Sequence, residues 1–422
     1  MTKIIHKDIQ ETLYKSIHPS GLTVIVLPKK NFHKTYVTLS TPFGADHTQI
    51  KHNEDILDIP LGTAHFLEHK LFDNNGDEIS VEFSKNNASV NAYTQNNQTT
   101  YLFNCSNHLH KNIHLLLDMV FNPTFTEEGI KKEQTIIDEE IEMYQDEPYT
   151  IMYEKLIDQM YFNHPIKNKI LGTKDSIREI TKEKLERIHQ TAYNPKHMIL
   201  FIVGKVDVDE TLTFVNNEVI RPSLKGYSLV DTPIVEPLEV VSNQPITVQH
   251  DVYIPHVSVG LKLNPDLFNY SNLKQELVFS ILMELLIGKS SDTYQAMVQG
   301  HLINDSFDVD VTLLPDASNI IFTCNIQKPD AFREAMNQLV TGDVLKTINN
   351  SDFIRVQNQI LGGFIYALNS LEYIANQYTK YHFNGDDLFN ILTIMRTITI
   401  KDIEQAYDGL KKGTLSYVTV IK

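Results

Sequence analysis

Short apolar runs and longer amphipathic stretches follow one another along this sequence. β-Branched and aromatic residues dominate four segments that we expect to be extended, at residues 22–27, 35–41, 90–103 and 198–203. Apolar residues three and four positions apart predict helices at about 62–72, 107–120, 127–147, 182–192, 272–287 and 353–370. Because the strands and helices do not alternate strictly, the pattern favours an α+β fold over a doubly wound parallel sheet.

The second half of the chain repeats features of the first half. Ile180–Glu186 resembles Ile398–Glu404, and in the same register His197–Gly204 falls on Leu415–Lys422. Two matches in one register indicate a duplicated domain of about half the chain. We therefore expect two tandem homologous domains.

A segment rich in proline separates the two repeats. Pro222, Pro233, Pro237 and Pro245 lie within it, and it shows little helical periodicity, which is typical of a linker. The expected organisation is an N-terminal domain at residues 1–221, a linker at 222–245 and a C-terminal domain at 246–422.

The segment Gly62–Lys70 carries the first candidate chemistry. A helix turns by about 100° per residue, so His65, Glu68 and His69 fall on about one third of its circumference. Imidazoles at positions i and i+4 can bind one zinc ion, and a carboxylate at i+3 lies beside it. This H-x-x-E-H pattern is the inverse of the more familiar zincin helix. A chance match is the alternative, but Pro60 and Gly62, just before the H-x-x-E-H motif, suit a helix start at this place.

A catalytic zinc ion needs a third protein ligand and keeps its fourth position for water. In the helix predicted at 127–147, Ile136, Ile137, Glu140 and Tyr144 point in about the same direction as Glu133. A carboxylate on an apolar face is costly unless it is paired or bound to metal. We therefore predict that Glu140 is the third ligand and that Glu133 orients a ligand from behind. The alternative is that Glu140 pairs with an arginine elsewhere.

A second group of polar residues has helical spacing at His110, His114 and Asp118. These residues flank an apolar stripe on the side expected to face solvent. We interpret them as surface residues and not as a metal site.

Composition excludes several classes of function. The formal net charge of -16 argues against a nucleic-acid-binding surface, which needs clustered Lys and Arg. The longest strongly apolar run, Met198–Val203, is far too short to span a membrane, and the first residues lack a signal-peptide core. Two isolated cysteines predict no disulfide framework. We expect a cytoplasmic protein with no nucleic-acid or membrane partner.

Beyond these motifs, the first half of the sequence resembles the pitrilysin/insulinase family of metallopeptidases, and the second half resembles it more weakly. The resemblance rests on Gly21–Val26, His65–His69, Asn91–Thr94 with Thr99 and Tyr101, Glu133 and Glu140, His164–Pro165 with Ile170–Thr173, Tyr193–Pro195 and Val203–Gly204.

The resemblance implies two domains, each a mostly antiparallel sheet packed with helices, of which only the first holds a metal. It also implies one Zn²⁺ per chain, ligated by His65, His69 and Glu140. Glu68 would be the general base, and Glu133 would support catalysis. The strand around Asn91 and Ala92 would bind a peptide as an added β-strand, recognising backbone more than side chains.

One departure from the family pattern concerns the second half. The family's active site normally receives an Arg and a Tyr from there, but Tyr294–Phe307 contains no Arg. The pattern resembles a small bacterial branch, associated with elongation factor P modification or peptide processing, in which a metal-binding chain pairs with a related chain that lacks the ligands. We therefore expect a partner that supplies the Arg and Tyr in trans, or a homodimer.

These observations lead to one main hypothesis and two alternatives. The main hypothesis is a zinc endopeptidase subunit that cleaves short or unfolded peptides with metal-activated water and Glu68 as the base. One alternative is a structural or assembly subunit that retains the metal site without turnover. The other is a metal-dependent hydrolase of non-peptide substrates, which the strand around Asn91 disfavours.

Overall fold

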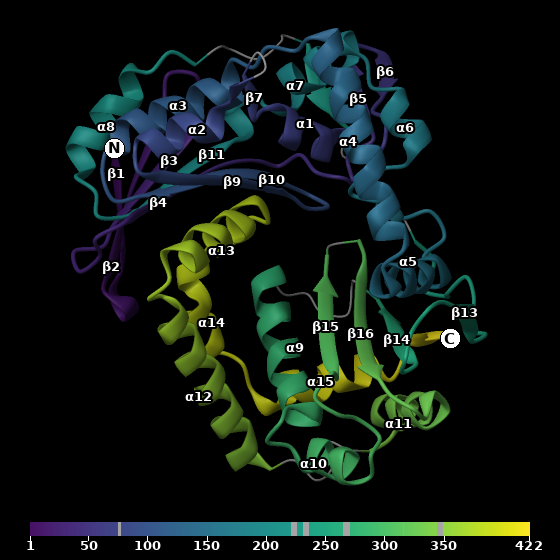
Figure 1. Ribbon diagram of the computed structural model, residues 1–422. Helices are drawn as coiled ribbons and strands as arrows, with labels where there is room; N and C mark the ends of the chain where they lie inside the picture. The colour runs from purple at the N-terminus through teal and green to yellow at the C-terminus, as the bar shows by residue number, and fades with distance from the viewer. Residues whose placement is uncertain (75–76, 221–225, 231–235, 265–270, 315, 344–348) are drawn as a thin grey trace. The chain divides into compact units, whose positions relative to one another are not determined.

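The computed structural model describes residues 1–422 apart from 75–76, 221–225, 231–235, 265–270, 315 and 344–348 (Figure 1). The chain divides into two compact units, and each unit contains segments from both halves of the sequence. Unit 1 comprises residues 1–142, 168–232 and 367–389, and unit 2 comprises residues 143–167, 233–366 and 390–422. Within the predicted linker, residues 222–225 and 231–235 lie outside the described part of the chain.

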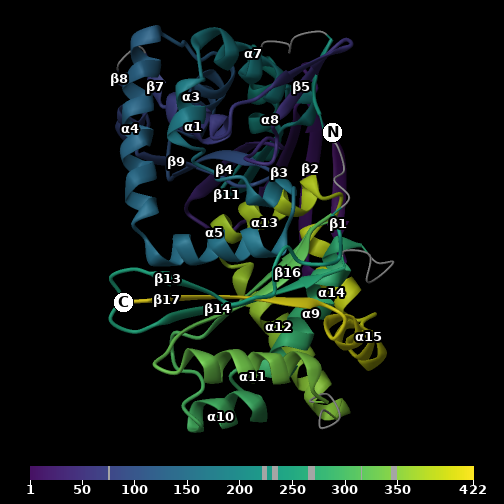
Figure 2. The same ribbon diagram turned by 90° about the vertical axis from the view of Figure 1, so that its right-hand side faces the viewer.

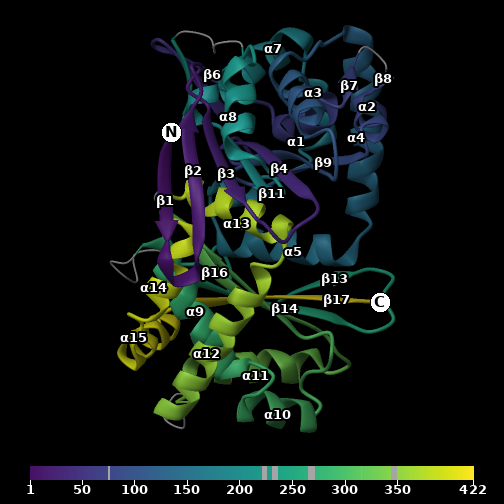
Figure 3. The ribbon, with the colours of Figure 1, turned by 90° about the vertical axis from the view of Figure 1, so that its left-hand side faces the viewer.

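A twisted sheet of seven strands forms the centre of unit 1, and Figure 3 shows its first strands side by side. Its strand order is β1-β2-β3-β11-β4-β10-β9, with β11 parallel to β3 and antiparallel to β4. The strands are β1 (Thr2–His6), β2 (Glu11–Ile17), β3 (Thr23–Pro28), β4 (Thr35–Thr41), β9 (Ala88–Thr94), β10 (Thr99–Cys105) and β11 (Ile199–Gly204). Strand β9 therefore forms one free edge of this sheet.

Helices cover both faces of the unit 1 sheet. One face carries α1 (Thr63–Lys70), α2 (Ile79–Lys85), α3 (Leu109–Phe121) and α8 (Val208–Asn217), and the opposite face carries α13 (Leu371–Phe383) (Figure 1). The main apolar core lies between the sheet and the first group of helices, where Val37, Leu39 and Phe66 are fully buried.

The remaining elements of unit 1 are short or lie at its border. They are β5 (Gln49–His52), β6 (Asp55–Asp58), β7 (Asp73–Asn74), β8 (Asp77–Glu78), α6 (Lys174–Arg178), α7 (Lys182–Ala192) and β12 (Tyr227–Leu229), together with α4 (Glu127–Gln145), whose last residues belong to unit 2.

Unit 2 repeats the topology of unit 1. Its sheet has the order β13-β17-β14-β16-β15, with β17 parallel to β13 and antiparallel to β14, which matches β3-β11-β4-β10-β9 strand for strand. The strands are β13 (Ile246–Gln249), β14 (His256–Leu263), β15 (Asp308–Leu313), β16 (Ser318–Asn325) and β17 (Thr414–Ile421). The predicted α+β fold of two tandem homologous domains is therefore confirmed.

Helices also cover both faces of the unit 2 sheet. The helices of this unit are α5 (Pro148–Met160), α9 (Asn272–Ile287), α10 (Asp292–Gln299), α11 (Pro329–Thr341), α12 (Asn350–Ala367), α14 (Ile391–Met395) and α15 (Ile400–Leu410). Helices α9, α11 and α15 contact one face, α5 covers the other face, and α10 and α14 pack on α9 (Figure 2).

The two repeats exchange one helix each. Helix α5 follows the long helix α4 of the first repeat but packs on β14 and β17 of the second repeat's sheet. In the same way, α13 follows α12 in the second half but packs on β4 and β11. Each of these two helices begins with a side-chain N-cap. The Glu147 carboxylate accepts the backbone N–H of Thr150 at the start of α5, and the Ser370 hydroxyl accepts that of Tyr373 at the start of α13.

The pattern of apolar residues located the elements well. The helix expected at 182–192 begins and ends at those residues, and the extended run 90–103 is the hairpin of β9 and β10. Among the described residues, no helix is long and apolar enough to cross a membrane. The exchange of α5 and α13 is the main feature that the pattern did not predict, because it depends on contacts distant in sequence.

The packing of α5 against β14 can be tested at Gly260. A Cβ atom at Gly260 would lie 2.6 Å from Sδ of Met160 and 3.0 Å from Cδ2 of Leu156, both on α5. We expect Gly260→Ala to lower the free energy of unfolding by about 1–3 kcal/mol, because overpacking forces these side chains or the strand to move. Denaturant unfolding measures the change.

Gly362→Ala is the matched control, because a Cβ atom there meets nothing within 4 Å inside helix α12. Alanine should raise the free energy of unfolding at this position by up to about 1 kcal/mol. If both substitutions change stability by the same amount in the same direction, the close packing of α5 on β14 is contradicted.

Candidate metal centre

Helix α1 presents the H-x-x-E-H residues, and Gly62 fixes where this helix begins. Gly62 is the N-cap and has φ of 85°, in the left-handed region that favours glycine. A Cβ atom at Gly62 would lie 2.5 Å from the carbonyl oxygen of Leu171. Only glycine allows both this backbone angle and this close approach, so Gly62 sets the position of α1 against the segment that follows α5.

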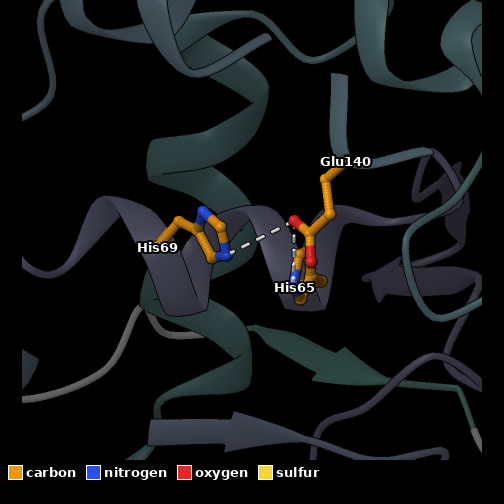
Figure 4. A group of neighbouring side chains, drawn as sticks. All are labelled: His65, His69 and Glu140. Carbon is orange, nitrogen blue, oxygen red and sulfur yellow. Dashed lines mark ion pairs between the residues drawn. The ribbon is translucent and has the colours of Figure 1, made fainter. Parts of the chain in front are cut away.

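Three side chains from two helices converge at one point (Figure 4). Nε2 of His65 and Nε2 of His69 each lie 3.8 Å from Oε2 of Glu140 on α4. The three potential ligand atoms all lie within 4.8 Å of one another. Around a tetrahedral zinc ion with bonds of about 2.0–2.1 Å, neighbouring ligand atoms are about 3.4 Å apart. The three side chains therefore fit a zinc ion after small movements inward.

The buried face of α4 differs from the one expected from the sequence. Ile130, Ile137 and Ile141 are buried, whereas Ile136 and Tyr144 are each more than 40% exposed. The expectation that Glu140 lies in the middle of an apolar stripe with Ile136 and Tyr144 is therefore wrong. Glu140 lies at the border of the buried face, because the core-facing direction of α4 is rotated away from it.

Glu133 orients the imidazole of His69. Its Oε1 atom lies 3.0 Å from Nδ1 of His69, and the Glu133 side chain is buried. Because a carboxylate only accepts hydrogen bonds, this contact places the ring proton on Nδ1 and leaves the Nε2 lone pair directed toward Glu140. The hydrogen bond to Glu133 raises the pKa of His69, against the opposing effect of burial. The structure thus places Glu133 in hydrogen-bonding contact with His69.

His65 is held in its neutral form by its surroundings. Burial, with a smaller contribution from the neighbouring His69, lowers the pKa of His65 to about 3. An imidazole must be neutral to donate a lone pair to a metal. The site therefore favours the form of His65 that can bind a cation.

Glu68 lies beside the three converging side chains but is not one of them. Its Oε2 atom accepts a hydrogen bond of 2.6 Å from the hydroxyl of Thr94 on β9. Burial raises the pKa of the Glu68 carboxyl, and hydrogen bonds from the side chain and backbone of Thr94 and the proximity of His69 oppose this rise. A carboxylate with a raised pKa next to a metal position can accept and return a proton.

Asn91 and Ala92 lie on the edge strand β9 and do not belong to the three converging side chains. Asn91 is exposed and Ala92 is half-buried. The Oδ1 atom of Asn91 accepts the backbone N–H of Ala92 at 2.9 Å. The free edge of β9 offers backbone groups to an added strand, which is the arrangement that β-strand addition requires.

The other group of polar residues lies at the surface of α3. The half-buried His110 is near Thr211 and Glu210, and the exposed His114 pairs with Glu218. Asp118 is exposed, and among the described residues the only group of three with metal-binding geometry is the one on α1 and α4. Their interpretation as surface residues is confirmed.

Two residues near the site were not identified from the sequence. Thr94 contacts Glu68, but only the packing of helix α1 on strand β9 reveals this contact. Lys70, directly after the motif, is only 2% exposed and forms an ion pair with Asp73. A Cβ atom at Gly129 in the first turn of α4 would lie 2.7 Å from the Lys70 ammonium. A glycine inside a predicted helix is the one signal that could have indicated this close contact.

Comparison with known proteins identifies the family. Residues 58–174 match the family described as Insulinase (Peptidase family M16), and residues 179–360 match the Peptidase M16 inactive domain. The uncharacterized zinc protease YmfH of Bacillus subtilis is 35% identical over 405 residues, which cover 95% of this chain and 94% of YmfH.

Solved structures show the same fold over nearly the whole chain. The crystal structure of an M16-like peptidase from Alicyclobacillus acidocaldarius superposes with a TM-score of 0.88 at 25% identity, covering 97% of this chain and 98% of that one. A protease from Helicobacter pylori gives a TM-score of 0.80 at 20% identity over 97% and 99% of the two chains. Because sequence and fold agree along both repeats, the chain belongs to the insulinase family of peptidases, family M16.

Proposed function

We propose that this chain is the metal-binding subunit of a zinc-dependent endopeptidase that cleaves short or unfolded peptides. One observation carries the proposal: His65, His69 and Glu140 converge within 4.8 Å of one another, and Glu68 lies beside them without joining the group. A structural zinc site has four protein ligands, whereas a catalytic site keeps one position open. Three converging side chains with a separate carboxylate match the second arrangement.

The residues of the site have complementary tasks in this mechanism. His65, His69 and Glu140 would hold the zinc ion, which when bound supplies polarisation of a carbonyl and a water molecule of lowered pKa. Glu68 takes the proton from the attacking water and returns it to the leaving amine. Its burial supports this role, because a raised pKa brings the carboxyl closer to the working pH. Glu133 keeps the ring of His69 in the required orientation.

The substrate class follows from the sheet edge next to the site. Strand β9 pairs only with β10 among the described residues, and its last residue contacts Glu68. A peptide that adds to β9 in extended form would run past the base with its backbone paired and its side chains free. This arrangement supports cleavage of extended polypeptide with little dependence on side-chain identity.

A second candidate function, a non-catalytic assembly subunit, rests on the second repeat. Tyr294–Phe307, around helix α10, contains no Arg, and the second half matches an inactive domain. We favour an active subunit that pairs with a related chain, or with a second copy of itself, which would supply the Arg and Tyr in trans. The intact set of potential ligands supports the active subunit.

The role of Glu68 as the base can be tested with Glu68→Gln. Glutamine has nearly the same size but cannot take a proton, so the rate of peptide cleavage should fall by about 10²–10⁴-fold or more. Zinc content, measured by elemental analysis, should stay at one ion per chain. A variant that cleaves as fast as the parent would exclude Glu68 as the base.

The role of Glu140 as a ligand can be tested against its neighbour. Glu140→Gln should weaken zinc binding strongly, because a neutral amide is a poor replacement for a carboxylate ligand, and peptide cleavage should be lost with it. Glu139→Gln removes an exposed carboxylate one residue away on α4 and should change neither. Zinc affinity is measured by competition with a chelator. Equal zinc affinity in the two variants would contradict the proposed site.

The two candidate functions differ in what a partner chain does. Peptide cleavage is measured with this chain alone and with a related chain of similar length that carries the Arg and Tyr but no H-x-x-E-H motif. The paired enzyme predicts cleavage in the mixture that exceeds the sum of the separate chains by at least tenfold. Stable complex formation with no cleavage in any sample would support the assembly subunit instead.

A further inference from the structure

Thr94 joins the general base to the strand that offers a free edge. It is the last residue of β9, and its hydroxyl donates to Oε2 of Glu68 at 2.6 Å. Glu68 comes from helix α1, so this one contact ties the end of β9 to the metal-binding helix. Thr94 does not belong to the group of potential ligands.

The register of the hairpin shows which backbone groups of β9 face the free edge. The backbone N–H of Gln95, just after β9, donates to the carbonyl of Gln98 across the turn to β10. In an antiparallel pair, successive residues point their backbone groups alternately toward the partner strand and away from it. Thr94 and Ala92 therefore direct their backbone groups away from β10. The contact between the Ala92 N–H and the Asn91 side chain independently agrees with this direction.

The carboxylate of Glu68 lies at the end of β9, where its Oε2 atom accepts the hydroxyl of Thr94. The outward backbone groups of Ala92, two residues earlier on the same strand, become accessible to an added strand once the Asn91 side chain moves. A peptide that pairs with β9 at Ala92 would therefore bring its backbone close to Glu68.

We propose that Thr94 is a positioning residue that fixes Glu68 at the end of β9 and thereby determines which peptide bond of an added strand meets the base. The inference rests on the proposed endopeptidase function. The hydroxyl of Thr94 holds the half-buried Glu68 carboxylate in one orientation, and the same residue ends β9, the strand whose register a paired peptide would follow.

The test removes the hydroxyl of Thr94 with little change in shape. For Thr94→Val, kcat on a peptide substrate should fall by about 10–100-fold, because a misplaced catalytic group loses rate on this scale, while KM changes by less than about threefold. Mass spectrometry of the products should show cleavage at bonds next to the original one. Zinc content should stay unchanged, and Thr94→Ser should restore kcat to within a few fold and the original cleavage position.

Thr100→Val is the matched control. The Thr100 hydroxyl forms a buried hydrogen bond of 2.8 Å with Ser40 in the same sheet, so valine there removes a comparable contact without touching Glu68. This variant should lose stability but keep the kcat and cleavage position of the parent. If Thr100→Val lowers kcat as much as Thr94→Val, the effect is a general weakening of the sheet and the proposal is wrong.

A crystal structure of the Thr94→Val variant gives a result that does not depend on turnover. The Glu68 carboxylate should rotate away from the end of β9, whereas an unchanged carboxylate position would overturn the positioning role.

Different results are expected if the proposed endopeptidase function itself is wrong. In that case Glu68→Gln retains full activity, or the parent cleaves no peptide with any partner. An inactive Glu68→Gln together with unchanged kinetics and products of Thr94→Val would overturn only the role of Thr94.

Discussion

The antiparallel contact between helices α1 and α4 is the constraint on which the site depends. Three contacts join the two helices: Lys70 lies beside Gly129, His69 contacts Glu133, and His65 faces Glu140. Residues later in α1 therefore contact residues earlier in α4. Polar side chains at the border of an apolar core are unfavourable unless each finds a partner. Glu133 is the partner for Nδ1 of His69, and Asp73 is the partner for Lys70.

The two Nε2 atoms and the Glu140 carboxylate are arranged differently from these pairs. At 3.8 Å, they are too far apart for hydrogen bonds yet directed toward a common point. A cation at that point would satisfy all three groups at once. The geometry of the helix pair thus leaves two imidazole nitrogens and one carboxylate directed at one point, where a cation would be their common partner.

Much of the fold and of the candidate site could be predicted from the sequence because the relevant signals are local. The H-x-x-E-H spacing places three side chains on one face of a single helix, and the repeat of Ile180–Glu186 at Ile398–Glu404 indicated the duplication. Features that depend on tertiary contacts were missed or wrong. The orientation of α4, which exposes Ile136 and Tyr144, depends on its tertiary contacts, and the contact of Thr94 with Glu68 follows from the packing of α1 on β9.

The exchange of helices α5 and α13 between the repeats affects how the chain can be divided. A fragment that ended at the predicted linker would keep the metal-binding residues but would lack α13, which covers β4 and β11. Phe201 on β11 stacks against Tyr378 of α13, so an apolar sheet face would become exposed to solvent. The duplicated halves are thus no longer independent folding units.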